Sequence, residues 1–354
     1  MITLAFAGRW SLRAAELFNT RVGSSEGRTA ISRFLLVLFS LLALPSLARP
    51  QKSAPPELRQ GGEYTIRVNA DSVVLPATVR NHKGTPVSGL GKDDFQVYED
   101  GVLQQIEYFS HEDIPVTVGL VVDNSGSMRP KRSEVIAAAL AFVRSSNPQD
   151  QMFVVNFNEH VSFGLPADTP FTDQAAQLQV ALSRINANGE TALYDAVAAA
   201  LDHLKMGNRD KKVLIVVSDG GDNASKHTLD QVLALARQSD AIIYTIDIHV
   251  EEDLDRNPTA LKRLAKATGG EDFLVESLPD VVPICAQIAH DIRSQYTLAY
   301  TPANKAQDRT YRVIRVKAKA PGHGALVVRT RAGYYAPSKP ESLPALAGRQ
   351  SSQP

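Results

Sequence analysis

Oxygen-bearing side chains are concentrated in one short segment, residues 123–127, which directly follows an apolar run. Asp123, Ser125 and Ser127 occupy alternate positions there, so their side chains can converge on one point, and Gly126 is expected to let the backbone bend between the serines. A carboxylate and two hydroxyls are hard oxygen ligands of the kind that Mg²⁺ prefers. The same residue types are also favoured in turns and at helix N-termini. The segment alone therefore leaves two interpretations open, a metal site or a capped turn.

Two later segments carry side chains of the same kind. Thr191 stands at the start of an expected helix, and Asp219 follows the apolar run 213–217. Taken singly, Thr191 reads as a helix N-cap and Asp219 as a turn residue. All three segments, however, fall where an expected strand or its connecting loop leads into a helix, the rim at which open α/β sheets bind ligands. Together they predict one metal site, with no catalytic residue and no site for an organic cofactor, formed by Asp123, Ser125, Ser127, Thr191 and Asp219.

The elements that must position this site alternate between strands and helices over residues 114–294. The apolar runs predict strands at 117–122, 152–157, 160–163, 213–217, 241–246 and 272–275. The spacing of apolar residues predicts helices at 130–145, 172–185, 191–206, 228–239, 259–267 and 281–293. Such alternation is typical of a doubly wound, mostly parallel, Rossmann-like α/β domain.

The segments on either side, 63–113 and 295–337, have β character. Asp100 and Gly101 predict a tight turn between strands at 95–99 and 104–109. The start of a first parallel strand and the end of a last crossover helix lie at the same pole of such a sheet. The two segments can therefore pack together as one small β-sandwich-like domain with the α/β domain inserted in it; two separate β units are the alternative.

The expected strand 311–318 has one basic face. Arg315, Lys317 and Lys319 alternate with apolar residues along it. A solvated strand surface that resists aggregation is the plainer interpretation. The functional alternative is a weak contact with anionic components of a cell envelope.

With these motifs in view, residues 114–294 resemble the von Willebrand factor type A domain family. Its metal-ion-dependent adhesion site is matched by Asp123-x-Ser125-x-Ser127, Thr191 and Asp219. The resemblance implies that the three hydroxyls contact the ion directly or through water, while the two carboxylates act mostly through bound water and hydrogen bonds. It also implies an open coordination position for an acidic side chain of a protein partner, as in cell adhesion. Mg²⁺ is the expected ion, with Mn²⁺ and Ca²⁺ as alternatives.

The outer β segments look like those of secreted bacterial members of this family. Residues 93–101 and 293–300 carry that similarity. It implies an exported protein, and no well-defined role for these segments comes with it.

Composition narrows the functional classes. The chain has 354 residues with 38 Lys and Arg against 38 Asp and Glu, and this balance argues against nucleic acid as a partner. The single cysteine, Cys285, excludes an intrachain disulfide and a Cys-rich zinc site. The common nucleotide-binding loop and the common serine-nucleophile motifs do not occur in the sequence. We therefore expect a binding protein, not an enzyme; a metal-assisted hydrolase and a structural envelope protein with a non-functional metal site are the alternatives.

The N-terminal segment predicts export. Residues 34–44 form an uncharged apolar run that follows Arg33 and precedes Pro45 and the small residues Ser46 and Ala48. This order is typical of a signal peptide, here residues 1–48. The run is shorter than the ~20 residues that span a bilayer, so we expect no stable membrane span after cleavage. An uncleaved membrane anchor is the alternative to a secreted, periplasmic or envelope protein.

Proline and glycine mark the chain ends as weakly structured. Residues 49–62 are expected to form a flexible linker, and residues 338–354 a disordered tail.

Cleavage after Ala48 is the first testable prediction. The small residues at 46 and 48 suit a signal peptidase, so the exported protein should begin at Arg49. Intact-mass analysis of the exported protein measures this directly. An exported protein that still contains Trp10 would contradict the assignment.

Overall fold

The computed structural model describes residues 72–184, 186–248 and 257–338. The predicted signal peptide 1–48, the linker 49–62 and the tail from residue 339 lie outside these residues. Among the helices of the described part, none combines the length and apolar character needed to cross a membrane.

A six-stranded sheet forms the centre of the α/β domain. Its strand order is β10-β9-β8-β5-β6-β7, in which all neighbours are parallel except β7, which runs antiparallel to β6. The strands are β5 (Val116–Asp123), β6 (Gln151–Phe157), β7 (Val161–Phe163), β8 (Lys211–Ser218), β9 (Ala241–Ile248) and β10 (Asp272–Val275). The prediction of a mostly parallel sheet is confirmed. Every residue of β5 is buried, as expected for a strand covered on both faces.

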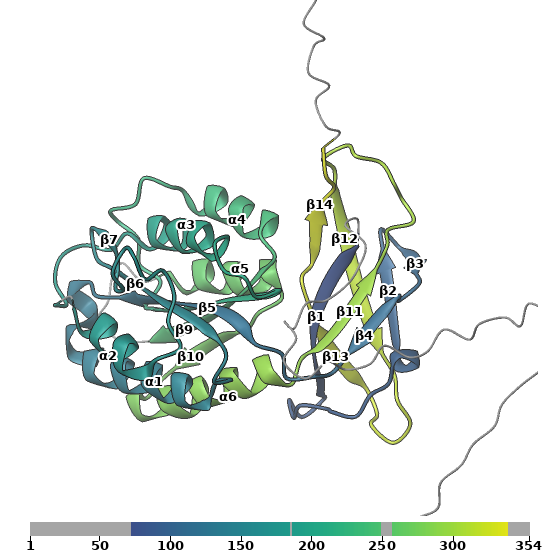
Figure 1. Cartoon of the computed structure of the whole chain (residues 1–354), viewed down its shortest axis with the longest axis horizontal. Helices are drawn as coiled ribbons and strands as arrows, with labels where there is room; N and C mark the ends of the chain where they lie inside the picture. The colour runs from purple at the N-terminus through teal and green to yellow at the C-terminus, as the bar shows by residue number, and fades with distance from the viewer. Residues whose placement is uncertain (1–71, 185, 249–256, 339–354) are drawn as a thin grey trace, which may run out of the picture. The chain divides into compact units, whose positions relative to one another are not determined.

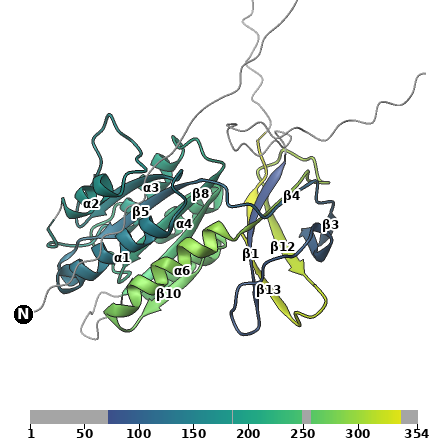
Figure 2. The same ribbon diagram turned by 60° about the horizontal axis from the view of Figure 1, so that its bottom comes forward.

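Helices cover both faces of this sheet. They are α1 (Arg132–Ser145), α2 (Ala175–Ser183), α3 (Leu193–Leu204), α4 (Leu229–Gln238), α5 (Pro258–Thr268) and α6 (Val281–Arg293). Figure 1 shows α3, α4 and α5 on one face and α1, α2 and α6 on the other, and Figure 2 shows α1 and α6 side by side. Cys285 is buried on α6. All of the predicted helices are present, and several of them are shorter than the apolar periodicity predicts.

The first helix begins later than the sequence predicts. Residues Gly126–Lys131 form a 3₁₀ segment, η2, and the α-helix starts only at Arg132. Pro130 lies inside η2 and lacks the N–H group that an α-helical turn would use. The backbone N–H of Met128 instead donates to the carbonyl of Ser125, three residues earlier, at 3.1 Å. The tighter turn keeps Ser125 and Ser127 at the end of the sheet.

Strands from both ends of the chain mix in two further sheets. One has the order β13-β1-β11-β4 and the other β14-β12-β2-β3. The strands are β1 (Val73–Asn81), β2 (Phe95–Glu99), β3 (Val102–Gln104), β4 (Tyr108–Ser110), β11 (Tyr296–Tyr300), β12 (Tyr311–Ala318), β13 (Leu326–Arg329) and β14 (Gly333–Tyr335), with short 3₁₀ turns η1 (Lys92–Asp94) and η3 (Leu278–Asp280) elsewhere. Residues from both sheets share one apolar core. The α/β domain is thus inserted in a small β-sandwich-like domain.

The hairpin predicted at Asp100 and Gly101 is present, but its second strand is shorter than expected. The φ angles of Asp100 and Gly101 are 47° and 83°, as a tight turn requires. The expected strand 104–109 is wrong: β3 ends at Gln104, and β4 pairs with β11 in the other sheet. Ile106 lies between them, 7% exposed, and fills the core where the chain crosses from one sheet to the other. Alternation of residues predicts extended backbone but not the sheet that it joins.

The segment that leads into the α/β domain and the segment that leaves it are bonded to each other. Arg293 Nε, at the end of α6, donates to Asp113 Oδ2 at 2.7 Å, just before β5. A ring nitrogen of His111 lies 3.1 Å from the carbonyl of Ser294, and the His111 ring stacks on Tyr296 with centroids 4.1 Å apart. Two backbone connections therefore run together at this junction.

Gly119 on β5 provides a test of the central packing. A Cβ atom there would lie 2.4 Å from the Phe153 ring and 2.5 Å from a Leu214 methyl. Overpacking of this kind destabilises a core, so Gly119→Ala should lower the free energy of unfolding by about 1–3 kcal/mol. Urea denaturation measures the change, with Gly91→Ala as the control because its Cβ would meet only Asp94 Oδ2 at 3.8 Å. Equal stability of the two variants would contradict this packing.

Candidate functional site

The register of the parallel strands brings the first and third site segments together. Val122 on β5 pairs with Val217 on β8, so Asp123 and Ser218 end their strands at the same level. Ser218 Oγ donates to Asp123 Oδ2 at 2.6 Å. The carboxyl ends of parallel strands share one edge of the sheet, which is why residues 95 positions apart meet here.

Four predicted residues form one continuous chain of hydrogen bonds, called here the oxygen cluster: Asp123, Ser125, Ser127 and Asp219. The Ser125 N–H donates to Asp123 Oδ1 at 2.8 Å, and the hydroxyls of Ser125 and Ser127 lie 3.1 Å apart. Ser127 Oγ donates to Asp219 Oδ2 at 2.6 Å. Asp123, Ser125 and Asp219 are each at most 3% exposed, and Ser127 is half-buried, so the two carboxyl groups are buried together.

Thr191 reaches the same rim on the loop before α3. This loop is held to the first segment, because the Gly126 N–H donates to the Gly189 carbonyl at 3.0 Å. It is held to the third segment as well, since the Thr191 N–H donates to Asn223 Oδ1 at 2.8 Å. Thr191 is 7% exposed. The contacts that fix it are made by its backbone, and its hydroxyl is not part of the hydrogen-bonded chain of the oxygen cluster.

The glycines that shape the site differ from the one expected. Gly126 does not adopt a positive φ, and a Cβ atom there would lie 3.5 Å from the Gly189 carbonyl, an ordinary contact. Gly189 and Gly220 have φ angles of 78° and 81°. A Cβ at Gly189 would lie 1.7 Å from a carboxylate oxygen of Glu159, and one at Gly220 would lie 2.6 Å from the Asn257 carbonyl. The turns of the second and third loops therefore require glycine.

Asp222 and Asn223, which follow Asp219 in the third loop, hold the loop of Thr191 in place. For an Asp-Asn pair after a strand the sequence favours a solvated turn, with a place at the rim of the site as the alternative. In the structure, Asn223 Oδ1 accepts the N–H of Thr191, and Asp222 Oδ1 accepts the N–H of Tyr194 at 3.2 Å. The sequence carried no sign of this, because the donors lie about thirty residues earlier in the chain.

A buried lysine also lies against the oxygen cluster. Lys131 is 1% exposed, and its Nζ lies 3.7 Å from Asp219 Oδ2. The same Nζ donates to the carbonyl of Ile248, at the end of β9, at 3.1 Å. Lysine is rarely fully buried unless it is paired, and the sequence gives no reason to expect burial at this position.

Comparison with known proteins identifies the α/β domain. The family profile described as the von Willebrand factor type A domain matches residues 118–221. These residues belong to the von Willebrand factor type A domain family. The matched segment contains all four members of the oxygen cluster and Thr191. A comparison with curated proteins found no match.

Solved structures of several such proteins are similar to this chain. BatB, a conserved hypothetical protein from Bacteroides thetaiotaomicron, is 17% identical and covers 51% of this chain and 100% of its own, with a TM-score of 0.41. A von Willebrand factor type A protein from Catenulispora acidiphila is 13% identical over 77% of this chain and 76% of its own, with a TM-score of 0.46. Proximal thread matrix protein 1 from the mussel byssus, described with a zinc-occupied MIDAS motif, is 16% identical over 55% and 50%, with a TM-score of 0.45. At these values the similarity carries no information on function.

Burial and like charge dominate the electrostatics of the site in this type A domain. Burial, followed by the negative charge of Asp219, raises the pKa of Asp123 to about 7, although hydrogen bonds from Ser218 and Ser125 oppose the shift. The described residues contain no group of three or more His, Cys, Asp or Glu side chains placed to hold a metal. A cation at this rim would therefore take its remaining oxygen ligands from the hydroxyls and from water. This donor set suits a hard divalent cation.

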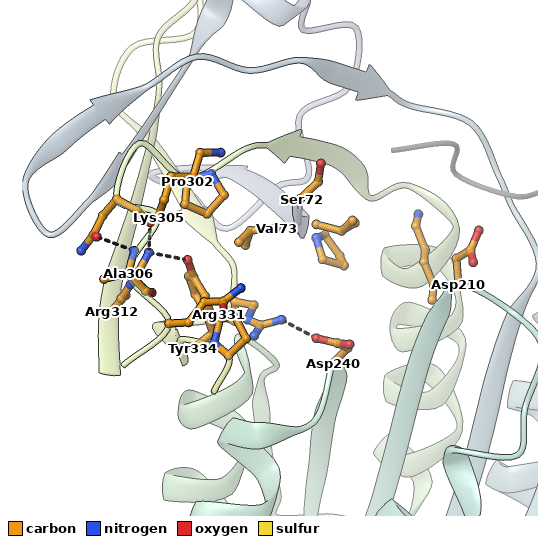
Figure 3. Close-up of a pocket in the computed structure, with 16 residues that line it drawn as sticks. Ser72, Val73, Asp210, Asp240, Pro302, Lys305, Ala306, Arg312, Arg331 and Tyr334 are labelled. Carbon is orange, nitrogen blue, oxygen red and sulfur yellow. Dashed lines mark hydrogen bonds and ion pairs between the residues drawn. The ribbon is translucent and has the colours of Figure 1, made fainter. Parts of the chain in front are cut away.

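A hollow lies away from the oxygen cluster. It has a volume of about 580 Å³, and its lining includes Asp210 and Lys211, at the beginning of β8, whereas Asp219 follows the end of that strand. Figure 3 shows Arg331 directed at Asp240 across part of this lining, with a contact of 2.7 Å. Arg312, also in the lining, forms a buried ion pair with Glu99 at 3.2 Å. Three of the charged residues in this lining, Asp240, Arg312 and Arg331, are therefore already paired within the protein.

The raised pKa of Asp123 predicts how stability depends on pH without metal. The folded protein binds a proton at Asp123 more tightly than the unfolded chain does, so this group's contribution to stability is lost as pH rises from about 4 through 7. Asp123→Asn keeps the shape of the side chain and removes its titration. In the presence of a chelator, wild-type protein should therefore lose more stability than Asp123→Asn between pH 5 and 8. Urea denaturation at both pH values measures this, and identical losses would contradict the prediction.

Proposed function

We propose that this chain is an exported protein whose type A domain binds a protein partner through a divalent cation at the oxygen cluster. The observation that carries the proposal is the joint burial of Asp123 and Asp219, linked through Ser125 and Ser127 at the ends of two neighbouring strands. Two buried carboxyl groups repel each other unless a proton or a cation lies nearby. Lys131 supplies one positive charge against two carboxylates, and a bound divalent cation would relieve the remaining repulsion.

The proposed ligands are the hydroxyls of Ser125, Ser127 and Thr191, directly or through water, with Asp123 and Asp219 acting mainly through bound water and hydrogen bonds. Mg²⁺ fits this hard, oxygen-only donor set and commonly keeps several waters. Mn²⁺ and Ca²⁺ are alternatives. When bound, the ion would supply a positive centre that a partner carboxylate can approach.

The charge of the site favours an acidic partner. Two carboxylates only just balance a divalent cation, and Lys131 adds a further positive charge 3.7 Å from Asp219. A loaded site would therefore keep a net attraction for an anion. We propose that an acidic side chain of a protein partner completes the coordination, and that the interaction involves no covalent chemistry.

Export is the second part of the proposal. It rests on the apolar run 34–44 and its flanking residues, whose order is typical of a signal peptide for export to the cell envelope or the exterior. There the concentration of free divalent cations is set by the surroundings. The basic face of β12, with Arg315 and Lys317, together with Lys319 directly after the strand, provides a weaker contact for anionic envelope components in this proposal.

Metal titration tests the proposed function. Calorimetry of wild-type protein with MgCl₂ should show binding, and Asp219→Asn should weaken it at least about tenfold because one of two carboxylates loses its charge. Asp202→Asn is the matched control, since this exposed carboxylate lies near the end of α3 that is remote from Thr191. Absence of binding to Mg²⁺, Mn²⁺ and Ca²⁺ would contradict the proposal.

Partner capture is the companion measurement. Wild-type protein should retain an envelope protein in Mg²⁺ and release it in a chelator, and Asp219→Asn should retain little of it. If metal binds but capture is the same in all three conditions, the ion serves the fold and not recognition. Turnover of a phosphoester or a peptide by the Mg²⁺-loaded protein would favour a hydrolase instead.

A further inference from the structure

Lys131 is a positive charge enclosed at the proposed metal site. It ends η2, the segment that carries Ser127, and is 1% exposed. Its Nζ has three neighbours: the Ile248 carbonyl at 3.1 Å, Asp219 Oδ2 at 3.7 Å and the Met128 sulfur at 3.7 Å. Of these, only Asp219 is charged. A buried ammonium group needs such a partner, because removal from water is costly for an unpaired charge.

The same carboxylate oxygen serves both Lys131 and the oxygen cluster. Asp219 Oδ2 accepts a hydrogen bond from the Ser127 hydroxyl at 2.6 Å and also lies 3.7 Å from Lys131 Nζ. A cation that uses the charge of Asp219 therefore competes with Lys131 for it. In a buried site with little water to screen it, repulsion between a divalent ion and a nearby ammonium group is strong.

The arginines near the rim are placed differently. Arg129 donates to the carbonyl of Ala187 at 3.0 Å, and Arg132 donates to Asn124 and to the carbonyl of Ser183. Neither is bound to a carboxylate of the oxygen cluster. Lys131 is the buried cation in direct ionic contact with that cluster in the described part of the chain.

We propose that Lys131 holds the affinity of the type A domain for a divalent cation low in the absence of a partner. This inference rests on the proposed function. With Lys131 in place, a divalent ion brings the two carboxylates and the lysine to a net positive charge, which the partner's carboxylate neutralises. Lys131 thereby makes stable binding of the cation depend on the partner's carboxylate, and it acts as a specificity-determining residue. The ion and an external carboxylate would bind cooperatively.

A purely structural role for Lys131 leads to a different expectation. Its contact with Ile248 joins η2 to the end of β9, across 117 residues of sequence. If that were its whole role, removal of the charge would lower stability and leave metal affinity unchanged or weaker. Metal affinity therefore separates the two roles.

The experiment compares Mg²⁺ binding by calorimetry in wild-type protein and Lys131→Met. Methionine keeps an unbranched apolar side chain beside Met128 and removes the charge. We expect Lys131→Met to bind Mg²⁺ at least about tenfold more tightly than wild type in chloride buffer. Lys211→Met is the matched control, because Lys211 is also buried, 3% exposed, but begins β8 at the edge opposite Asp219. It should bind Mg²⁺ as wild type does.

A second arm measures cooperativity with a simple carboxylate. Mg²⁺ titrations are repeated in acetate in place of chloride at the same ionic strength. Acetate should strengthen Mg²⁺ binding by wild-type protein by a larger factor than it does for Lys131→Met. Equal factors would overturn the inference.

The remaining outcomes are also decisive. Unchanged or weaker Mg²⁺ binding by a folded Lys131→Met protein would overturn the inference and leave the proposed function standing. Absence of binding in wild type and variant alike would overturn both. If Lys131→Met does not fold, Lys131→Gln replaces it, since glutamine retains a donor for the Ile248 carbonyl without the charge. The same tighter binding of Mg²⁺ is expected of it.

Discussion

The burial of two carboxyl groups at one edge of a sheet is the constraint on which the rest of this domain depends. Asp123 and Asp219 are drawn together by the backbone, not by each other, since the pairing of β5 with β8 fixes where each strand ends. The repulsion between them is met by hydroxyl donors from Ser127 and Ser218 and by the Lys131 ammonium group. Stability supplied by the sheet is thus used to hold an electrostatically unfavourable arrangement.

The three loops share the task of keeping that arrangement in place. Gly189 and Gly220 adopt conformations that a side chain would obstruct, and Asn223 links the loop of Thr191 to that of Asp219. The site is therefore formed largely before any ligand arrives. A preformed rim reduces the ordering that a partner must impose when it binds.

Most of the fold could be predicted from the sequence because it depends on local patterns of residues. The strand at Asp272–Val275 and the helix at Val281–Arg293 have the predicted bounds, and both follow from apolar periodicity. Features that depend on contacts between residues far apart in the sequence could not be predicted. Lys131 owes its burial to Ile248 and Asp219, which lie far along the chain, and β4 owes its sheet to β11. The motif residues could be named because their types are unusual together, whereas the residues that support them are ordinary turn or helix residues until the fold places them.

The fastened junction between the two domains has a mechanical consequence. A domain joined by one strand of backbone can swivel about that strand, and tension on it passes through a single connection. Here the segments before β5 and after α6 run together, joined by Arg293 with Asp113 and by His111 with Ser294 and Tyr296. A pull transmitted through the type A domain would be shared by two parallel backbones, and it would have to separate these contacts before either could peel away.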